Sequence, residues 1–115
     1  MPYASIDSGS NTFRLLIAEH SDGPTPWNRV DYPHRITRLG EGLHHTGRLA
    51  DTGMDRAIDT YREFATLLNK HGIPTEHTFA AATAAIREAE NGPQFCERVK
   101  TETGIAIQII SGEDE

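Results

Sequence analysis

Cysteine is nearly absent from this chain, which has one such residue, Cys96, among 115. A single cysteine excludes an internal disulfide framework and a zinc site built from several cysteines. Because reducing compartments favour such a composition, we expect an intracellular, cytoplasmic location. Cys96 falls on the apolar face of an expected helix, so we expect it to pack in the core and not to act as a nucleophile.

Long apolar runs are also missing. Apolar runs such as Leu15 to Ala18 and Ile105 to Ile107 fall far short of the roughly 20 residues that a membrane-spanning helix needs. The first residues, Met1 to Ser5, contain neither a basic region nor an apolar signal segment. We therefore expect neither secretion nor a membrane partner.

Positive charge and aromatic residues are both scarce. Lys and Arg number 11 against 17 Asp and Glu, which gives a formal net charge of −6, and aromatic residues make up 7%. Nucleic acids are bound by basic faces and by stacked aromatic side chains, so we expect no nucleic-acid partner. A phosphate site is not excluded, because backbone N–H groups and one or two arginines are enough to build one.

The apolar pattern predicts an α/β domain with a mixed sheet. It begins with an antiparallel hairpin and a third strand, and continues with helices that alternate with parallel strands joined by right-handed crossovers. The predicted strands cover residues 3–7, 12–19, 27–32 or 34–39, 77–82 and 105–110, and the predicted helices cover 53–71, 83–90 and 93–104. No helix follows the last strand, so we expect the chain to be part of a larger protein.

The helix over residues 53–71 has the clearest pattern. Its apolar residues recur at three- and four-residue spacing, which places one stripe against a core. Asp51 or Thr52 is expected to cap its first turn, and Gly72 to end it. The stripe comprises Met54, Ala57, Ile58, Tyr61, Phe64, Ala65 and Leu68.

The turn after the first strand offers donors to an anion. Asp7 ends the strand and can hold a divalent cation, and Gly9 lets an oxyanion approach the backbone closely. The N–H groups of such a turn can converge on a phosphate. From spacing alone, an ordinary hairpin turn explains the same residues. The side-chain donors of this turn are Ser10, Asn11 and Thr12.

Two further strand ends carry candidate residues. Thr83 and Arg87 follow a strand where ligands bind in open α/β sheets, and Arg87 suits bidentate phosphate contacts. Glu113, Asp114 and Glu115 follow the last strand, where a carboxylate can act as general base for an attacking water. The first of these strand ends is explained equally well by a helix-capping Thr83 and a solvated Arg87. The second is explained equally well by solvated acidic residues in the first turn of a helix. We expect the three strand ends to converge on one crevice.

Four segments resemble signatures of the exopolyphosphatase / guanosine pentaphosphate phosphohydrolase (Ppx/GppA) family. They occur in the family's order and spacing and cover the chain nearly from end to end. The segments are Ala4 to Ile17, Ile36 to Leu43, Ala82 to Ala89 and Ile109 to Glu115. The resemblance implies an actin-like ATPase (ribonuclease H-like) fold. It also implies hydrolysis of the terminal phosphoanhydride bonds of polyphosphate or pppGpp, with Mg²⁺ as cofactor.

By matching motifs, the resemblance assigns roles to individual residues. The turn from Asp7 to Thr12 would be the first phosphate loop, with Asp7 at the metal, and Arg87 would contact phosphate. Glu115, the last acid of the Ser-Gly-x-x-Glu motif, would be the catalytic base. Residues 1–115 would form an incomplete N-terminal actin-like domain, because the family's second phosphate loop and second domain are absent. We expect the isolated chain to be inactive, and a homodimer of the full-length protein is compatible with the resemblance.

Position 8 departs from the family pattern, because Ser8 stands where the family has an apolar residue. We expect its side chain to point away from the donors of the loop. Two other functions stay open: a nucleotide-dependent kinase or ATPase of the same fold, and a non-catalytic module that binds phosphate, a nucleotide or a partner protein. Polyphosphate and pppGpp are not separated, because both present a terminal phosphate on an anhydride chain.

Overall fold

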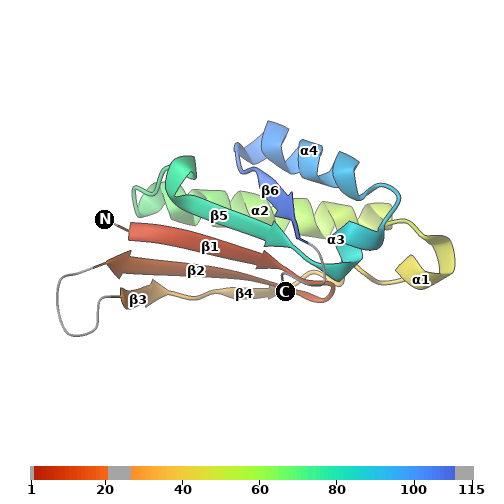
Figure 1. Ribbon diagram of the computed structural model, residues 1–115, viewed down its shortest axis with the longest axis horizontal. Coiled ribbons are helices and arrows are strands. Elements are labelled where there is room, and N and C mark those ends of the chain that lie inside the picture. Colours follow the sequence, from red (N-terminus) through yellow and green to blue (C-terminus); the bar gives the residue numbers. More distant parts are fainter. Residues whose placement is uncertain (1, 21–26, 111–115) are drawn as a thin grey trace.

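A computed structural model describes residues 2–20 and 27–110 and shows one mixed sheet with helices on one face (Figure 1). The strands are β1 Pro2–Ser8, β2 Thr12–His20, β3 Trp27–Asp31, β4 His34–Ile36, β5 Thr78–Ala82 and β6 Ile107–Ile109. The helices are α1 Leu43–Thr46, α2 Asp51–Lys70, α3 Ala84–Glu88 and α4 Gly92–Thr103, and a 3₁₀ turn covers Thr75–His77.

The sheet has the predicted mixed topology. Its strand order is β3-β2-β1-β5-β6, and β4 pairs with β2 beyond the end of β3. Strands β1 and β2 form the antiparallel hairpin, in a register that runs from Pro2 opposite Glu19 to Ser8 opposite Phe13. Strand β5 is parallel to β1, and β6 is parallel to β5. The carboxyl ends of β1, β5 and β6 therefore meet at one edge of the sheet.

Both candidates for the third strand are strands in the structure. They flank Pro33, and both pair with β2 in antiparallel orientation. Proline has no N–H to donate, which explains the interruption. The Pro33 carbonyl accepts a hydrogen bond from the Leu15 N–H at 3.0 Å, and the register of β2 against β3 shifts between Ile17 and Ala18.

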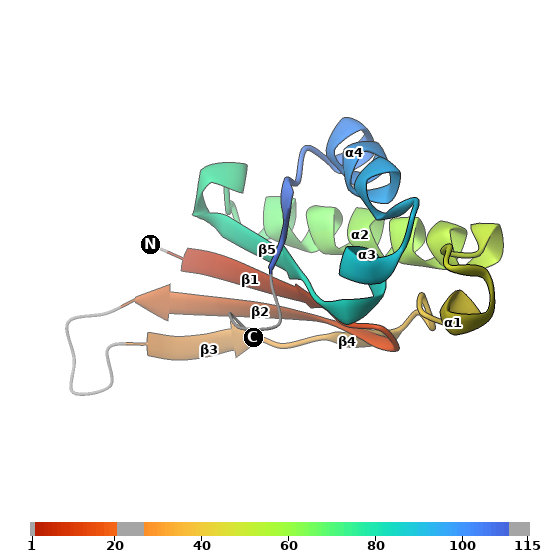
Figure 2. The same ribbon diagram turned by 45° about the vertical axis from the view of Figure 1, so that its right-hand side comes forward.

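The core lies between the sheet and α2, on the side where α2, α3 and α4 all lie (Figure 2). Alternation along β2 buries Phe13, Leu15 and Ile17 completely, as the period of a strand requires. The Phe13 ring packs edge-on against Tyr61, with ring centroids 5.5 Å apart. The apolar stripe of α2 is confirmed, with Met54 half-buried at its margin. Its fully or nearly fully buried members are Ala57, Ile58, Tyr61, Phe64 and Leu68.

Several element ends differ from the predictions. Helix α2 begins at Asp51, with Ala50 as its capping residue and no side-chain cap, so neither Asp51 nor Thr52 has the predicted role. Asp51 instead lies in the first turn, where a carboxylate favours the positive end of the helix dipole. The short helix α1 was not predicted, and glycines with positive φ, Gly42 and Gly47, flank it. Helix α3 and strand β6 are shorter than the ranges 83–90 and 105–110.

Cys96 lies half-buried on α4 and packs against the core, in line with the prediction. Burial raises the pKa of its thiol, which disfavours the nucleophilic thiolate. Within residues 2–20 and 27–110, no helix is both long enough and apolar enough to cross a membrane.

Candidate phosphate site

The three strand ends meet around one cavity of about 360 Å³. Asp7 and Gly9 reach it from the end of β1, Thr83 from the residue after β5, and Ile110 from the residue after β6. Its complete lining is Ser5, Ile6, Asp7, Gly9, Ala81, Thr83 and Ile110. The convergence of these strand ends on one crevice, expected from the order of the elements, is therefore present.

The segment Thr37 to Gly40 bonds to the carbonyl groups of the turn between β1 and β2. The Gly40 N–H donates to the Ser10 carbonyl at 2.8 Å. The N–H groups of Thr37 and Arg38 both donate to the Asn11 carbonyl, at 2.9 and 3.1 Å. These bonds use the carbonyl side of the turn and fix its shape.

The N–H side of the same turn is open. Within the described residues, neither the Ser10 N–H nor the Asn11 N–H has a protein acceptor, whereas the Gly9 N–H donates to the Thr12 carbonyl at 3.2 Å. Two adjacent backbone donors without an acceptor, at the end of a central strand, match the kind of nest that binds anions.

Gly9 serves the turn by its small size. Its φ is not positive, so the left-handed backbone that would favour glycine is not the reason for this residue. A Cβ atom at this position would lie 3.1 Å from the Thr12 carbonyl oxygen, which is tighter than ordinary contact. A side chain here would also stand at the rim of the cavity that Gly9 lines.

Ser8 points into the core, as expected for a residue that departs from an apolar pattern without disturbing the loop. It is buried, and its hydroxyl forms a short hydrogen bond with the hydroxyl of Tyr61 on α2. Burial raises the pKa of Tyr61, and the bond to Ser8 opposes that shift in part. The last residue before the loop is thereby fixed to the helix layer.

Arg14 is a candidate site residue that the motif analysis missed. It lies directly opposite Asp7 in the β1–β2 register, and its Nη1 is 3.9 Å from Oδ2 of Asp7. Both side chains are about half exposed and lie on the face of the sheet without helices. Alternation along β2 was the available signal, because it places Arg14 on the face opposite Phe13.

Arg87 is held at the end of β6. Its Nη1 donates to the Ile110 carbonyl at 2.9 Å, and its backbone N–H donates to the Thr83 carbonyl at 3.0 Å. Thr83 occupies the capping position of α3, but its side chain makes no capping bond. Arg87 does not line the cavity itself, so its contact with phosphate stays a prediction.

Glu115, Glu113 and Asp114 lie outside the described residues, so their predicted roles are not tested. Within the described ranges, no three His, Cys, Asp or Glu side chains gather closely enough to hold a metal ion. The single carboxylate of Asp7 is nevertheless suited to Mg²⁺, which binds through one or two carboxylates together with substrate phosphates and water.

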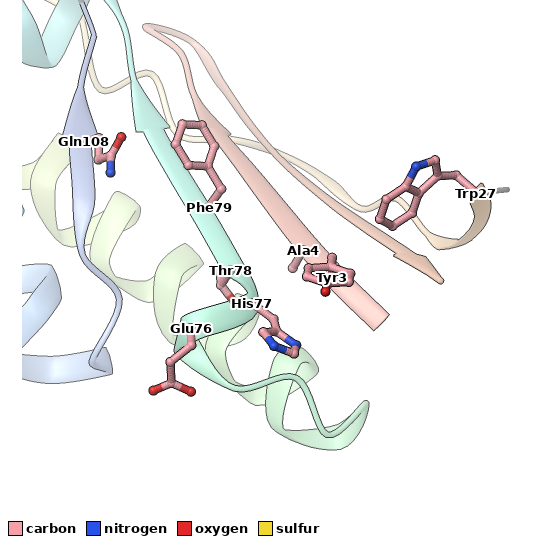
Figure 3. A pocket seen from close by; sticks show the side chains of 8 residues that line it. All are labelled: Tyr3, Ala4, Trp27, Glu76, His77, Thr78, Phe79 and Gln108. Atoms are coloured by element: carbon pink, nitrogen blue, oxygen red, sulfur yellow. The ribbon is translucent and has the colours of Figure 1, made fainter. Parts of the chain in front are cut away.

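The uncovered face of the sheet carries a second, aromatic hollow of about 430 Å³ (Figure 3). The Tyr3 ring stacks on His77 at 4.7 Å and meets Trp27 edge-on at 5.6 Å. Phe79, half exposed on β5, extends the same surface. Trp27 thus belongs to an aromatic cluster with Tyr3 and His77, which are distant from it in the sequence.

The fold and the turn together define the class of protein. A hairpin with a phosphate-type turn, continued by parallel strands and crossover helices, is the architecture of an actin-like ATPase domain. The chain superposes on the crystal structure of the Aquifex aeolicus Ppx/GppA family member with a TM-score of 0.92 and 37% identity, over 99% of this chain and 36% of that one. The family model described as "Ppx/GppA phosphatase family" matches residues 16–115, and the chain belongs to this family.

Two curated relatives are enzymes named for phosphoanhydride substrates. Exopolyphosphatase 1 of Mycobacterium tuberculosis is 38% identical over 112 residues, which are 96% of this chain and 31% of that protein. Guanosine-5'-triphosphate,3'-diphosphate pyrophosphatase of Vibrio vulnificus is 36% identical over 113 residues, which are 98% of this chain and 22% of that protein. The chain thus spans a third or less of the length of these relatives.

Proposed function

We propose that this chain supplies the first phosphate-binding half of an enzyme that hydrolyses terminal phosphoanhydride bonds of inorganic polyphosphate or pppGpp. The observation that carries the proposal is the pair of Ser10 and Asn11 N–H groups, which have no acceptor within the described residues. They follow directly on Gly9, which lines the cavity where three strand ends meet. The names of the two relatives support the substrate class.

The turn would bind the terminal phosphate through its backbone. The carbonyls of Ser10 and Asn11 are already taken by the segment Thr37 to Gly40, so the N–H groups are pre-oriented and need little ordering on binding. The Thr12 and Asn11 side chains would add donors at the same phosphate. Arg14, across the hairpin from Asp7, would contribute positive charge on the same face.

Asp7 fits the role of a Mg²⁺ ligand. It lines the cavity next to Gly9 and is half exposed, so it can bind a cation that the substrate brings with it. When bound, the metal would neutralise charge on the phosphate oxygens. Arg14 balances the Asp7 carboxylate when no metal is present.

Glu115 would act as the general base toward the attacking water. Water is a poor nucleophile at neutral pH, and a carboxylate within hydrogen-bond reach can accept its proton as the new P–O bond forms. The anhydride P–O bond of the terminal phosphate breaks in the same reaction, and orthophosphate and the shortened phosphate chain are the products. Arg87 would fix the start of the segment that carries Glu115, because it holds the carbonyl of Ile110. Arg87 would also contact a phosphate oxygen.

The test uses a protein that contains this chain and extends to the length of its relatives. Glu115→Gln keeps size and polarity but cannot accept the proton, so kcat should fall by about 10²–10⁴. Substrate affinity should change little, because the phosphate is held by the turn. Glu113→Gln is the matched control and should leave kcat within about threefold, because we propose no direct role for that acid.

Phosphate release and equilibrium binding are measured for both variants on polyphosphate and pppGpp. Near-normal kcat in Glu115→Gln, or a larger defect in Glu113→Gln, would place the base elsewhere. Binding without any phosphate release by the unchanged protein would favour a non-catalytic module. We propose that the 115-residue chain alone releases no phosphate. Phosphoryl-transfer catalysis depends mainly on positioning the substrate, and the family's second phosphate loop would be needed for that positioning.

A further inference from the structure

A third cavity, of about 440 Å³, is lined in part by Arg38, which belongs to the segment that bonds to the phosphate turn. Its lining residues are Ile36, Arg38, Glu41 and Arg56, and we call it the two-arginine pocket. It shares no residue with the cavity at Asp7 and Gly9. Two guanidinium groups against one carboxylate give it a net positive charge in a chain that is acidic overall.

Arg38 has an uncommon backbone. Its φ is 52°, and within the described ranges it is the one residue other than glycine with a positive φ. The neighbouring structure enforces this conformation, because the Arg38 N–H donates to Asn11 and the Arg38 carbonyl accepts from Glu41, both at 3.1 Å. A glycine would adopt the same backbone without steric cost, so the presence of an arginine here is explained by its side chain.

Within the described residues, the Arg38 guanidinium makes neither a hydrogen bond nor an ion pair, and it is exposed at the pocket. Arg56 is different, because its Nε donates to the Thr37 carbonyl at 2.8 Å. This bond fixes the Arg56 guanidinium at the pocket and leaves its terminal nitrogens without a partner among the described residues.

We propose that the two-arginine pocket binds an inner phosphate of a polyphosphate chain whose terminal phosphate lies at the Ser10–Asn11 turn. Arg38 is in direct contact with the turn, because the Thr37 and Arg38 N–H groups bond to the Asn11 carbonyl. A ligand that occupies both the pocket and the turn must carry several phosphates in one flexible chain. Guanidinium groups suit such a chain, since they bind phosphate oxygens in pairs. This inference rests on the proposed function.

The test measures the affinity of the 115-residue chain for inorganic tripolyphosphate and for orthophosphate by calorimetry. Arg38→Gln should weaken tripolyphosphate binding by about fivefold to tenfold, a modest loss because the group is exposed and screened. Orthophosphate binding should stay within about twofold, because a single phosphate occupies the turn alone. Glu41→Gln should strengthen tripolyphosphate binding, because it removes the one opposing charge.

Two variants separate a ligand role from a structural one. Arg38→Gly should raise the melting temperature, because it relieves the backbone, and should still weaken tripolyphosphate binding as Arg38→Gln does. Lys70→Gln, at the far end of α2, removes an equal charge and should leave both affinities unchanged. A tripolyphosphate affinity of Arg38→Gln within twofold of the unchanged chain would overturn the inference, and so would weaker binding in Glu41→Gln.

Gly9→Val distinguishes the failure of this inference from the failure of the proposed function. If Gly9→Val abolishes tripolyphosphate binding and Arg38→Gln has no effect, the phosphate turn is supported and the two-arginine pocket is overturned. If Arg38→Gln weakens binding and Gly9→Val does not, the pocket binds the phosphate chain without the turn, and both the proposed role of the turn and the shared ligand are overturned.

Discussion

The Ser8 and Tyr61 hydroxyls form a buried hydrogen bond that joins the end of β1 to the middle of α2, across 53 positions of sequence. Ser8 is the last residue before the turn that presents the N–H groups of Ser10 and Asn11. Tyr61 is fully buried, in edge-on contact with Phe13 and Phe64. One polar pair within an apolar layer thus joins the start of the phosphate turn to the core helix.

A double-mutant cycle on this pair should show strong coupling. Ser8→Ala leaves the Tyr61 hydroxyl buried without a partner, and Tyr61→Phe does the same to Ser8. Each single change should lower the free energy of unfolding by about 1–3 kcal/mol. The double variant should be less destabilised than the sum of the two, because no polar group is left unpaired. Urea unfolding of all four proteins measures this, and strict additivity would mean that the bond contributes nothing.

The stability of the domain should fall at alkaline pH through Tyr61. Burial raises the pKa of this group in the folded state, whereas a tyrosine in the unfolded chain has a pKa of about 10. Below about pH 10 both the folded and the unfolded state hold this proton, so Tyr61 gives the free energy of unfolding no pH dependence. Above it only the folded state keeps the proton, so stability decreases with a slope of up to about 1.4 kcal/mol per pH unit.

The free energy of unfolding, measured between about pH 8 and 11.5, tests this titration because the range spans the pKa of an unfolded tyrosine. Tyr61→Phe should lose this part of the alkaline dependence. Tyr3→Phe is the matched control, because Tyr3 is exposed, and it should leave the profile unchanged. An identical alkaline slope in Tyr61→Phe would assign the effect to other groups.

Two glycines should respond in opposite directions to alanine. At Gly92, the first residue of α4, a Cβ atom would lie 2.0 Å from the Ile86 backbone oxygen, so Gly92→Ala should destabilise the domain by about 3 kcal/mol. At Gly53, within α2, the nearest atoms belong to Leu39 at 3.6 Å, which is ordinary contact. Gly53→Ala should stabilise by about 0.5–1 kcal/mol, because alanine favours helix more than glycine does. Thermal unfolding gives both signs, and similar values for the two variants would contradict the geometry.

Substitution at Gly9 should impair phosphate binding more than it impairs stability. The valine side chain would crowd the Thr12 carbonyl and enter the cavity that Gly9 lines. We expect Gly9→Val to weaken orthophosphate binding by about tenfold or more, since the turn must shift to accommodate the added atoms. Ser10→Ala is the control, because it keeps both backbone donors and should cost about threefold or less. Both affinities are measured by calorimetry. Normal orthophosphate binding by Gly9→Val would show that the turn is not the phosphate site.

Features that depend on local periodicity could be predicted from the amino-acid sequence. Alternation along β2 and the stripe of α2 placed Phe13 and Tyr61 in the core, because strands and helices turn side chains at fixed intervals. The order of elements predicted parallel later strands and the meeting of their ends. Local motifs also identified the family to which the chain belongs.

Contacts between groups that are distant in the sequence follow only from the three-dimensional packing. The bond between Ser8 and Tyr61, the support of Ser10 and Asn11 by Thr37 to Gly40, and the left-handed backbone of Arg38 all depend on packing between distant segments. Helix α2 also begins without the predicted cap, because its start is set by the layer against which it packs. The spacing of residues along the chain does not predict such contacts. Two distant segments come together because their shapes fit and because each satisfies hydrogen-bonding groups of the other.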